Sequence, residues 1–355
     1  MSKKKKELYV NLYDYISDDY PFQIFIGGRG IGKTFSILRE CLTHCSSSNK
    51  FIYMRRTDKE LQFLMDTKKG EGVGNPFKAL NTKFTWNYGI LKVYDSVGGI
   101  FRRELDEENH FIYAQQVGYA IALSTIAGIR GIDFSDCTDL VFDEFIPEKH
   151  VQKISNEGFA TLNAIETINR NRELDGQKPI RVWLLSNATN IEHDLLRTLG
   201  LVNVIEKMKK RGIEHQYFKD RGLAVHIFGD TNEFVEKKQQ TALYKLTKGT
   251  DFYDFSLSND FVFNDDSLVE FRQLKGYVPF VQVDNAYCYR KKGETDIYVT
   301  YAKNRVSHTY SLKHEQDIMH FREHYGIMFR NLFINQKIHF ESYELKSVIL
   351  NILLG

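Results

Sequence analysis

Few cysteines, few prolines and the absence of a long hydrophobic run exclude several classes of protein for this 355-residue sequence. Its four scattered cysteines cannot build a disulfide scaffold, and no CxxC pair supplies a zinc site, so we expect free thiols in a reducing compartment. The longest apolar stretch, 119–129, is interrupted by Ser124 and Thr125 and is too short to span a bilayer. The basic N-terminus lacks the apolar core of a signal peptide. We therefore expect a soluble intracellular protein without a membrane partner.

The sequence also lacks an excess of either charge. Its 48 Lys and Arg residues face 46 Asp and Glu residues, which leaves a formal net charge of +2. This balance excludes a histone-like or polybasic protein, so a nucleic acid could bind only at a local basic patch. Only 5 prolines stand against 24 glycines, which argues against a long disordered linker.

Strand-like and helix-like patterns alternate over the first two thirds of the chain. The apolar runs typical of strands are 22–26, 51–54, 139–142, 182–185 and 224–228. Helical spacing of apolar residues separates them at 33–45, 58–65 and 160–172. This alternation predicts an α/β fold with a mainly parallel sheet that is buried on both faces.

Residues 82–123 follow a different pattern and predict an antiparallel insertion or sheet edge. Polar and apolar residues alternate at 83–87, 90–94 and 100–104, and Gly98-Gly99 reads as turn punctuation.

The chain changes character after about residue 235. We expect an α/β domain over 1–235, a polar helical connector over 236–265, and a small α+β domain over 266–355. Within the last part, residues 278–301 alternate like a β-meander with a turn at Lys291-Lys-Gly293.

The strongest motif matches the P-loop (Walker A) pattern and lies between a predicted strand and a predicted helix. Its residues, the predicted nucleotide-binding set, are Gly27, Gly28, Arg29, Gly30, Ile31, Gly32, Lys33 and Thr34. Glycines allow backbone amides to surround phosphates at a helix N-terminus. Lys33 is expected to reach the β- and γ-phosphates of ATP, and Thr34 to hold Mg²⁺.

A second motif places two carboxylates at the end of a buried strand, as a Walker B element requires. In Asp139-Leu-Val-Phe-Asp143-Glu144, Asp143 is expected to bind Mg²⁺, and Glu144 to activate the water that attacks the γ-phosphate. A nucleotide kinase needs no such base, whereas a motor ATPase does.

Small polar residues end another predicted strand, in Val182-Trp-Leu-Leu-Ser186-Asn187. Ligands of α/β sheets bind at the carboxyl ends of strands. Ser186 and Asn187 therefore fit a γ-phosphate sensor on a strand between the P-loop and Walker B strands, and a simple strand-end cap is the alternative.

Three arginines have two interpretations each. Arg170 and Arg172 close the helix predicted at 160–172, and Arg130 lies in Gly128-Ile-Arg130-Gly131. Basic residues near a helix C-terminus often only stabilise its dipole. A ring ATPase, however, needs an arginine that reaches the γ-phosphate of the neighbouring subunit.

Two further basic groups are candidates for nucleic-acid contacts, with a solvated charged face as the alternative. They are Arg55, Arg56 and Lys59 after the second strand, and Lys291, Lys292, Lys303 and Arg305 in the C-terminal part.

Several of these motifs together resemble a known family. They are Gly28-Arg-Gly-Ile-Gly-Lys33, Phe51-Ile-Tyr-Met-Arg-Arg56, Val141-Phe-Asp-Glu-Phe-Ile146, Arg170-Asn-Arg-Glu173 and Leu185-Ser-Asn-Ala188. In this order they are similar to the DNA-packaging (encapsidation) ATPases of phi-29-type short-tailed phages, which are related to large terminase subunits. The likeness is dense over residues 20–190 and thin afterwards.

The resemblance implies partners and roles. It implies a homopentameric ring at the portal vertex of a prohead in the host cytoplasm, which uses ATP and Mg²⁺ to move double-stranded DNA. It implies Arg170 as the arginine offered to the neighbouring subunit and Arg130 as a second basic residue there, with Arg172 as the fallback.

The resemblance also implies an RNase H-like C-terminal domain that does not cut DNA and that in some relatives docks on a structural packaging RNA. Large terminases carry a cluster of metal-binding carboxylates in this domain. Here the spacing of Asp284, Glu294 and Asp296 does not force them into one metal site.

We therefore predict a P-loop motor ATPase of the additional-strand, catalytic-glutamate type that packages viral DNA. One rival is a non-motor NTP-binding regulator, which would have no use for a nuclease-like domain. The other is a cellular DNA helicase or transposition-type ATPase.

Overall fold

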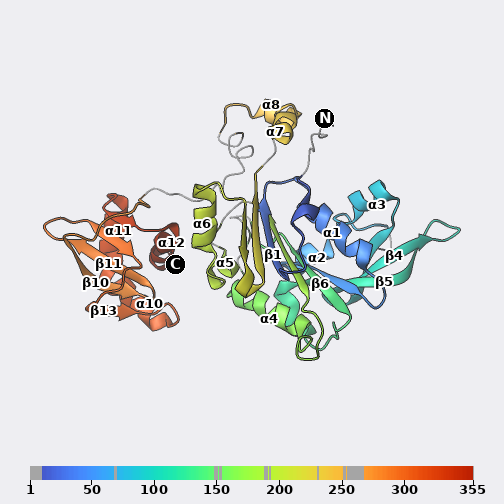
Figure 1. The fold of residues 1–355 in the computed structure, drawn as a ribbon, viewed down its shortest axis with the longest axis horizontal. Coiled ribbons are helices and arrows are strands. Elements are labelled where there is room, and N and C mark those ends of the chain that lie inside the picture. The colour runs from blue at the N-terminus through green and yellow to red at the C-terminus, as the bar shows by residue number, and fades with distance from the viewer. Residues whose placement is uncertain are drawn as a thin grey trace. The chain divides into compact units, whose positions relative to one another are not determined.

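The computed structural model describes residues 10–67, 70–147, 151, 154–187, 191, 193–229, 232–250, 253 and 268–354. The described residues form two compact units (Figure 1). The first draws on 1–199 and 207–262, and the second on 200–206 and 263–355. The predicted connector therefore falls largely in the first unit, and its residues 254–265 lie outside the described ones.

A mixed sheet with the strand order β3-β4-β5-β2-β6-β7-β1-β9-β8 organises the described part of the first unit (Figure 1). Its strands are β1 (Phe22–Gly27), β2 (Lys50–Arg55), β3 (Tyr88–Tyr94), β4 (Val97–Leu105), β5 (Phe111–Ala122), β6 (Cys137–Asp143), β7 (Arg181–Asn187), β8 (His215–Phe218) and β9 (Leu223–Phe228). The six central strands from β5 to β9 pair in parallel, and β3, β4 and β8 pair antiparallel at the edges. The predicted α/β class and the antiparallel edge are confirmed.

Strand β7 lies between β1 and β6 and pairs in parallel with both. In this register Gly27 is opposite Asn187, and Asp143 is opposite Leu185. The inserted strand is the feature that defines the additional-strand type, so this prediction is confirmed. It also brings three strand ends with polar residues to one edge of the sheet.

Helices and short 3₁₀ turns connect the strands of the first unit. They are η1 (Leu12–Tyr15), α1 (Lys33–His44), α2 (Asp58–Gln62), α3 (Lys78–Phe84), η2 (Leu123–Ile129), α4 (Glu157–Asn169), α5 (Asp194–Thr198), α6 (Val202–Lys210), η3 (Lys219–Arg221), α7 (Asn232–Gln239) and α8 (Ala242–Leu246). Helix α1 buries Ile37 and Leu38 in one hydrophobic core with Phe25, Val141 and Trp183 of the sheet. This packing fixes the start of α1, and with it the P-loop, against the strand ends.

Three details of the sequence interpretation are wrong. Residues 83–87 form no strand, because helix α3 runs to Phe84 and Thr85 ends it in a left-handed conformation. Gly98-Gly99 is no turn but lies inside β4, where a Cβ at Gly98 would come within 2.5 Å of Ile90. The helix predicted at 160–172 is α4, which ends at Asn169.

The second unit has an α+β fold. Its strands are β10 (Tyr277–Val283), β11 (Ala286–Lys291), β12 (Ile297–Thr300), β13 (His308–Tyr310) and β14 (Ile338–Phe340), in the order β13-β10-β11-β12-β14. The helical segments are α10 (Glu315–Phe321), the π-helical turn η4 (Arg322–Gly326), α11 (Ile327–Ile334) and α12 (Tyr343–Leu354). The predicted meander is present as β10 to β12. Strand β13 adds parallel to β10 at one edge, and β14 adds parallel to β12 at the other.

The acidic residues of the second unit contact separate partners. Asp284 accepts a hydrogen bond from the Leu312 backbone at 3.2 Å, Glu294 pairs with Lys291, and Asp296 pairs with Arg272. Across the described ranges no three metal-ligating side chains gather into a cluster. Also within these ranges, every helix is too short or too polar to cross a membrane.

Candidate nucleotide-binding site

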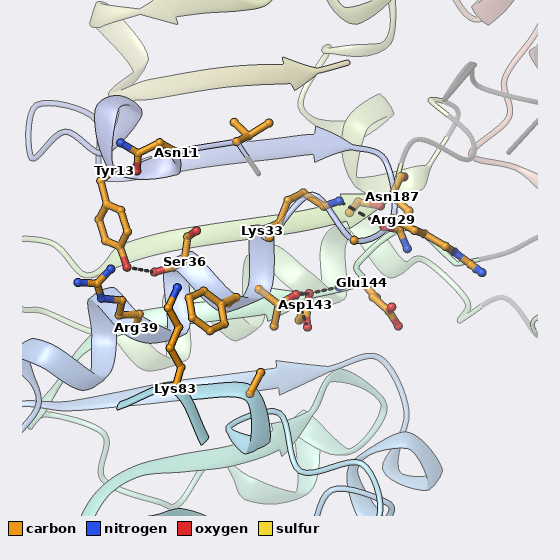
Figure 2. A pocket seen from close by; sticks show the side chains of 17 residues that line it. Asn11, Tyr13, Arg29, Lys33, Ser36, Arg39, Lys83, Asp143, Glu144 and Asn187 are labelled. Carbon is orange, nitrogen blue, oxygen red and sulfur yellow. Dashed lines mark hydrogen bonds between the residues drawn. The ribbon is translucent and has the colours of Figure 1, made fainter. Parts of the chain in front are cut away.

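The P-loop joins β1 to α1 at the edge of the sheet where β6 and β7 also end (Figure 2). Gly30 and Gly32 have φ angles of 82° and 97°, in the left-handed region that glycine adopts without strain. The Nζ atom of Lys33 donates to the carbonyl oxygens of Gly27 and Gly28, at 2.9 and 2.7 Å, and so closes the loop on itself. Ile31 is buried, whereas Arg29 is exposed.

The two residues predicted to hold Mg²⁺, Thr34 and Asp143, are in contact. The hydroxyl of Thr34 lies 3.0 and 3.1 Å from the two carboxylate oxygens of Asp143. The hydroxyl of Tyr53, on β2, also donates to Asp143 at 2.7 Å. A hydroxyl beside a carboxylate is an oxygen donor set that suits Mg²⁺, which prefers such hard ligands. The residues therefore fit the metal that the sequence predicts here.

Glu144 follows Asp143 with a left-handed backbone, φ 53°, which turns the chain sharply at the end of β6. Its side chain is 52% exposed and lines the cavity described below. Its Oε2 atom accepts a hydrogen bond from Arg55 at 2.6 Å. Arg55 also lies 3.7 Å from Asp143, so one guanidinium serves both carboxylates.

The charges of the site shift two pKa values. Burial raises the pKa of Asp143, and the nearby Arg55 and the hydroxyl of Tyr53 offset this effect only in part. Burial would lower the pKa of Arg55, but its neighbours Tyr53, Glu144 and Asp143 outweigh burial and raise it. Arg55 is therefore a permanent cation next to the Walker B pair.

The predicted sensor residues lie where the sequence placed them. The Oδ1 atom of Asn187 accepts a hydrogen bond from Lys33 Nζ at 3.3 Å, so the end of β7 contacts the P-loop (Figure 2). Ser186 is buried, and its hydroxyl donates to the Asn187 carbonyl. Both residues line the cavity described next.

A cavity of about 1100 Å³ extends from the P-loop along α1 to the N-terminal segment. Its end away from Glu144 is lined by Asn11, Tyr13, Ser36, Arg39 and Lys83 (Figure 2). The guanidinium of Arg39 lies 5.1 Å from the centre of the Tyr13 ring, and the hydroxyl of Tyr13 donates to the Ser36 carbonyl.

Sequence reasoning missed this end of the cavity. Ser36 and Arg39 carried a signal, because polar residues three apart on a helix share a face. Tyr13 and Lys83 carried none, since they come from η1 and α3, which are distant in the chain.

The arginines considered for a neighbouring subunit differ in their contacts. Arg130 is exposed directly after η2. Arg170 is 44% exposed, has a left-handed φ of 44°, and donates to the Ile132 carbonyl at 2.8 Å. Arg172 donates to the carbonyls of Lys178, Ser135 and Cys137. Arg170 caps the C-terminus of α4, since its backbone N–H donates to the Glu166 carbonyl at 2.7 Å, whereas Arg172 lies beyond the end of the helix.

Arg56 requires a correction. Its side chain is only 1% exposed and forms a two-pronged contact with Glu157, so it is not available to a nucleic acid. Lys59 is exposed. In the second unit Lys292, Lys303 and Arg305 are exposed, while Lys291 pairs with Glu294 at 2.6 Å.

Known proteins resemble this chain over most of its length. The DNA packaging protein of Bacillus phage phi29 is 26% identical over 284 residues, which are 79% of this chain and 74% of the relative. The DNA packaging protein of Bacillus phage B103 is 28% identical over 259 residues, 72% of this chain and 69% of the relative.

Two solved structures share the fold. The bacteriophage Phi-29 viral genome packaging motor assembly matches with a TM-score of 0.65 and 21% identity, over 98% of both chains. The Phi-28 gp11 DNA packaging motor matches with a TM-score of 0.61 and 19% identity, again over 98% of both.

The family model described as "Podovirus DNA encapsidation protein (Gp16)" matches residues 4–348. This match spans nearly the whole sequence and confirms the family that the motifs predicted. The chain belongs to the podovirus DNA encapsidation proteins.

Proposed function

We propose that this protein is the ATP-hydrolysing subunit of a motor that drives double-stranded viral DNA into a prohead. The observation that carries the proposal is the contact between Thr34 and Asp143, with Glu144 beside it at the open end of the cavity. It joins the two halves of an ATPase site in a chain whose relatives are named DNA packaging proteins.

The residues divide the chemistry between them. Backbone amides of the P-loop and Lys33 would bind the phosphates, and Thr34 and Asp143 would hold Mg²⁺. Bound Mg²⁺ would neutralise charge on the β- and γ-phosphates. Glu144 accepts the proton of the water that attacks the γ-phosphorus. Asn187, already hydrogen-bonded to Lys33, is the group that responds to the γ-phosphate.

The far end of the cavity is the proposed subsite for the base and ribose. Tyr13 offers an aromatic face, and Arg39 and Lys83 offer cations, to a flat and polar ligand. The distance along α1 from Lys33 to Arg39 is about 9 Å at 1.5 Å per residue, which suits a nucleoside attached to its phosphates.

The assembly is proposed by analogy with the relatives. It is a homopentameric ring at the portal vertex of the prohead, in the host cytoplasm, with Arg170 completing the site of the neighbouring subunit and Arg130 or Arg172 as alternatives. Its DNA contacts are to the phosphate backbone and are independent of sequence. Arg55 faces the nucleotide site, so Lys59 is the better candidate for DNA in that group. Lys291, Lys292, Lys303 and Arg305 remain candidates for DNA or a packaging RNA.

A packaging reaction tests the proposal. Proheads that carry their portal are mixed with DNA, ATP and the protein, and the DNA protected from nuclease is measured. Wild-type protein with ATP should protect DNA, and Lys33→Ala protein or a non-hydrolysable ATP analogue should not. Equal protection without hydrolysis would contradict a motor and favour a regulator that only binds NTP.

A further inference from the structure

A second group of charged side chains is buried outside the nucleotide cavity, where the mechanism above does not use it. The Nε and Nη2 atoms of Arg56 donate to Oε1 and Oε2 of Glu157 at 2.6 and 2.9 Å. The Nε2 atom of His193 lies 3.4 Å from Oε2 of the same carboxylate. Arg56, Glu157 and His193 are 1%, 3% and 7% exposed. We refer to these three residues as the buried triad.

Burying charge is costly, so the triad needs a reason. Apolar residues of similar volume often stabilise a protein as well as a buried ion pair does. Burial alone would raise the pKa of Glu157, but the hydrogen bonds from His193 and Arg56 outweigh it and lower the pKa. Glu157 is therefore an ionised carboxylate held by two partners in a fixed geometry. Such a fork fixes direction better than apolar packing does.

The three members of the triad lie at the ends of elements that also lead to residues of the proposed ATPase site. Arg56 directly follows Arg55, which binds Glu144. His193 begins α5, shortly after the strand that ends in Asn187. Glu157 is the first residue of α4, and Arg170 directly follows the last. The triad thus connects two strand ends of one active site to the helix that carries the arginine proposed for the next site.

The start of α4 is fixed closely by α5 as well. The backbone of Gly158 donates to Asp194 at 2.7 Å, and a Cβ at Gly158 would come within 2.4 Å of Thr198. Helix α4 has 13 residues, which make a rod of about 20 Å. A small rotation at Glu157 therefore displaces the far end of the helix, where Arg170 sits.

We propose that Arg56, Glu157 and His193 are positioning residues that set the direction of α4, and so of Arg170, according to the state of the chain's own nucleotide site. The inference rests on the proposed function, because it takes Arg170 as the group offered to the neighbouring subunit. When Arg55 shifts toward or away from the nucleotide, the adjacent Arg56 moves with it. The two hydrogen bonds from Arg56 to Glu157 then transmit this movement to α4.

Mixed rings test the proposal. One chain carries Arg170→Ala and keeps its own site, so it hydrolyses ATP only if a neighbour supplies an arginine. The other carries Glu144→Gln and serves only as the donor of Arg170. The test donor adds Arg56→Met and Glu157→Leu, which replace the ion pair by apolar side chains. ATPase rate against mixing ratio, ATP affinity and melting temperature are measured for each donor.

A matched control donor loses a different buried ion pair. Arg103, on β4, and Asp66 lie 2.8 Å apart with side chains 2% and 1% exposed. Their other hydrogen bonds join them to Glu71, Gly72, Asn87 and Tyr113, which lie outside α4. The control donor therefore adds Arg103→Met and Asp66→Leu to Glu144→Gln. It should restore activity as well as the Glu144→Gln donor does.

The test donor should bind ATP like the parent donor, which carries Glu144→Gln alone, but it should restore at least tenfold less ATPase activity. Small errors in the orientation of a catalytic group reduce a rate by this much or more. Equal restoration by the test and parent donors overturns the proposal. If the test donor does not fold, Arg56→Lys replaces the apolar pair; it keeps the charge and loses the fork, and equal restoration by it also overturns the proposal. Failure of the parent mixture itself shows that Arg170 does not act across subunits, which removes that part of the proposed function and this inference with it.

Discussion

The hydroxyl of Thr34 contacts both carboxylate oxygens of Asp143, although 109 positions separate the two residues in the chain. Thr34 lies in the first turn of α1, and Asp143 is the last residue of β6. The contact exists because helix α1 packs against the sheet at the neighbouring strands β6 and β7. The fold itself therefore brings together the oxygen donors proposed for Mg²⁺.

Lys33→Ala should weaken ATP binding at least tenfold. The change removes a side chain that contacts both the loop carbonyls and Asn187, and with it a charge-assisted contact to phosphate. Titration with a fluorescent ATP analogue measures the Kd. Lys92→Ala, which removes an exposed lysine on β3, is the control and should bind like wild type. An unchanged Kd for Lys33→Ala would exclude Lys33 from the phosphate site.

Arg55→Gln should move the acid limb of the ATPase rate to higher pH. Burial raises the pKa of Asp143, and the charge of Arg55 lowers it, so removing this charge raises the pKa further. Asp143 must be ionised to bind a metal ion, so a higher pKa means that the enzyme needs a higher pH to be active. The rate as a function of pH measures the effect. Arg55→Lys keeps the charge and should leave the limb near its original pH, and identical profiles for all three proteins would contradict the argument.

Arg39→Ala and Tyr13→Ala should each raise the KM for ATP about three- to tenfold while kcat stays within about twofold. Contacts to the base and ribose are the same in the ground state and the transition state, so their loss affects binding alone. Steady-state kinetics separate the two constants. A fall in kcat at constant KM would mean that these residues do not bind the nucleoside.

The sequence predicted the residues that we propose for the chemistry, but not those that we propose for the nucleoside. The P-loop, Asp143, Glu144 and Asn187 lie in contiguous motifs at the ends of apolar strands, and such motifs keep their meaning without knowledge of the strand order. Tyr13 and Lys83 approach Arg39 only through tertiary packing. The aromatic residues of 83–87 also mimicked a strand, since Phe84 and Trp86 pack on the core from the end of a helix and the turn after it.

Arg56 shows the limit of reading charge from sequence. Adjacent arginines after a strand resemble a basic patch, but the extended chain points neighbouring side chains in opposite directions. Arg55 consequently contacts Glu144, and Arg56 is buried against Glu157. The burial of Arg56 follows from the position of α4, which the sequence does not give.

The protein should lose stability below pH 6.5 because of His226. Burial lowers the pKa of this histidine, on β9, to about 4, and it lies 3.1 Å from the ring nitrogen of His215. Because the folded protein favours the neutral form of His226, the unfolded chain takes up a proton at a higher pH than the folded one does. The contribution of His226 to the free energy of unfolding is therefore complete above pH 6.5 and is lost as the pH falls toward 4. The loss is on the order of 3 kcal/mol. Urea unfolding at pH 7 and pH 4.5 measures it.

His226→Phe serves as the comparison, because Phe keeps the stacking on Phe25, whose ring centre lies 4.8 Å away. The variant should lose less stability than wild type over the same interval. An equal loss in both proteins would assign the acid sensitivity to other groups.

ATP hydrolysis by Glu144→Gln protein is the most direct test of the ATPase site. The change keeps the size of the side chain, and Lys33, Thr34 and Asp143 are untouched, so ATP and Mg²⁺ should bind with nearly the wild-type Kd. Hydrolysis in the presence of DNA should fall by about two to four orders of magnitude, as expected for the loss of a general base. Both quantities are measured on one preparation, by nucleotide retention and by phosphate release. Retained ATP with stalled release is the predicted result, and normal turnover by this variant would contradict the assignment of Asp143 and Glu144 as the catalytic pair of a packaging ATPase.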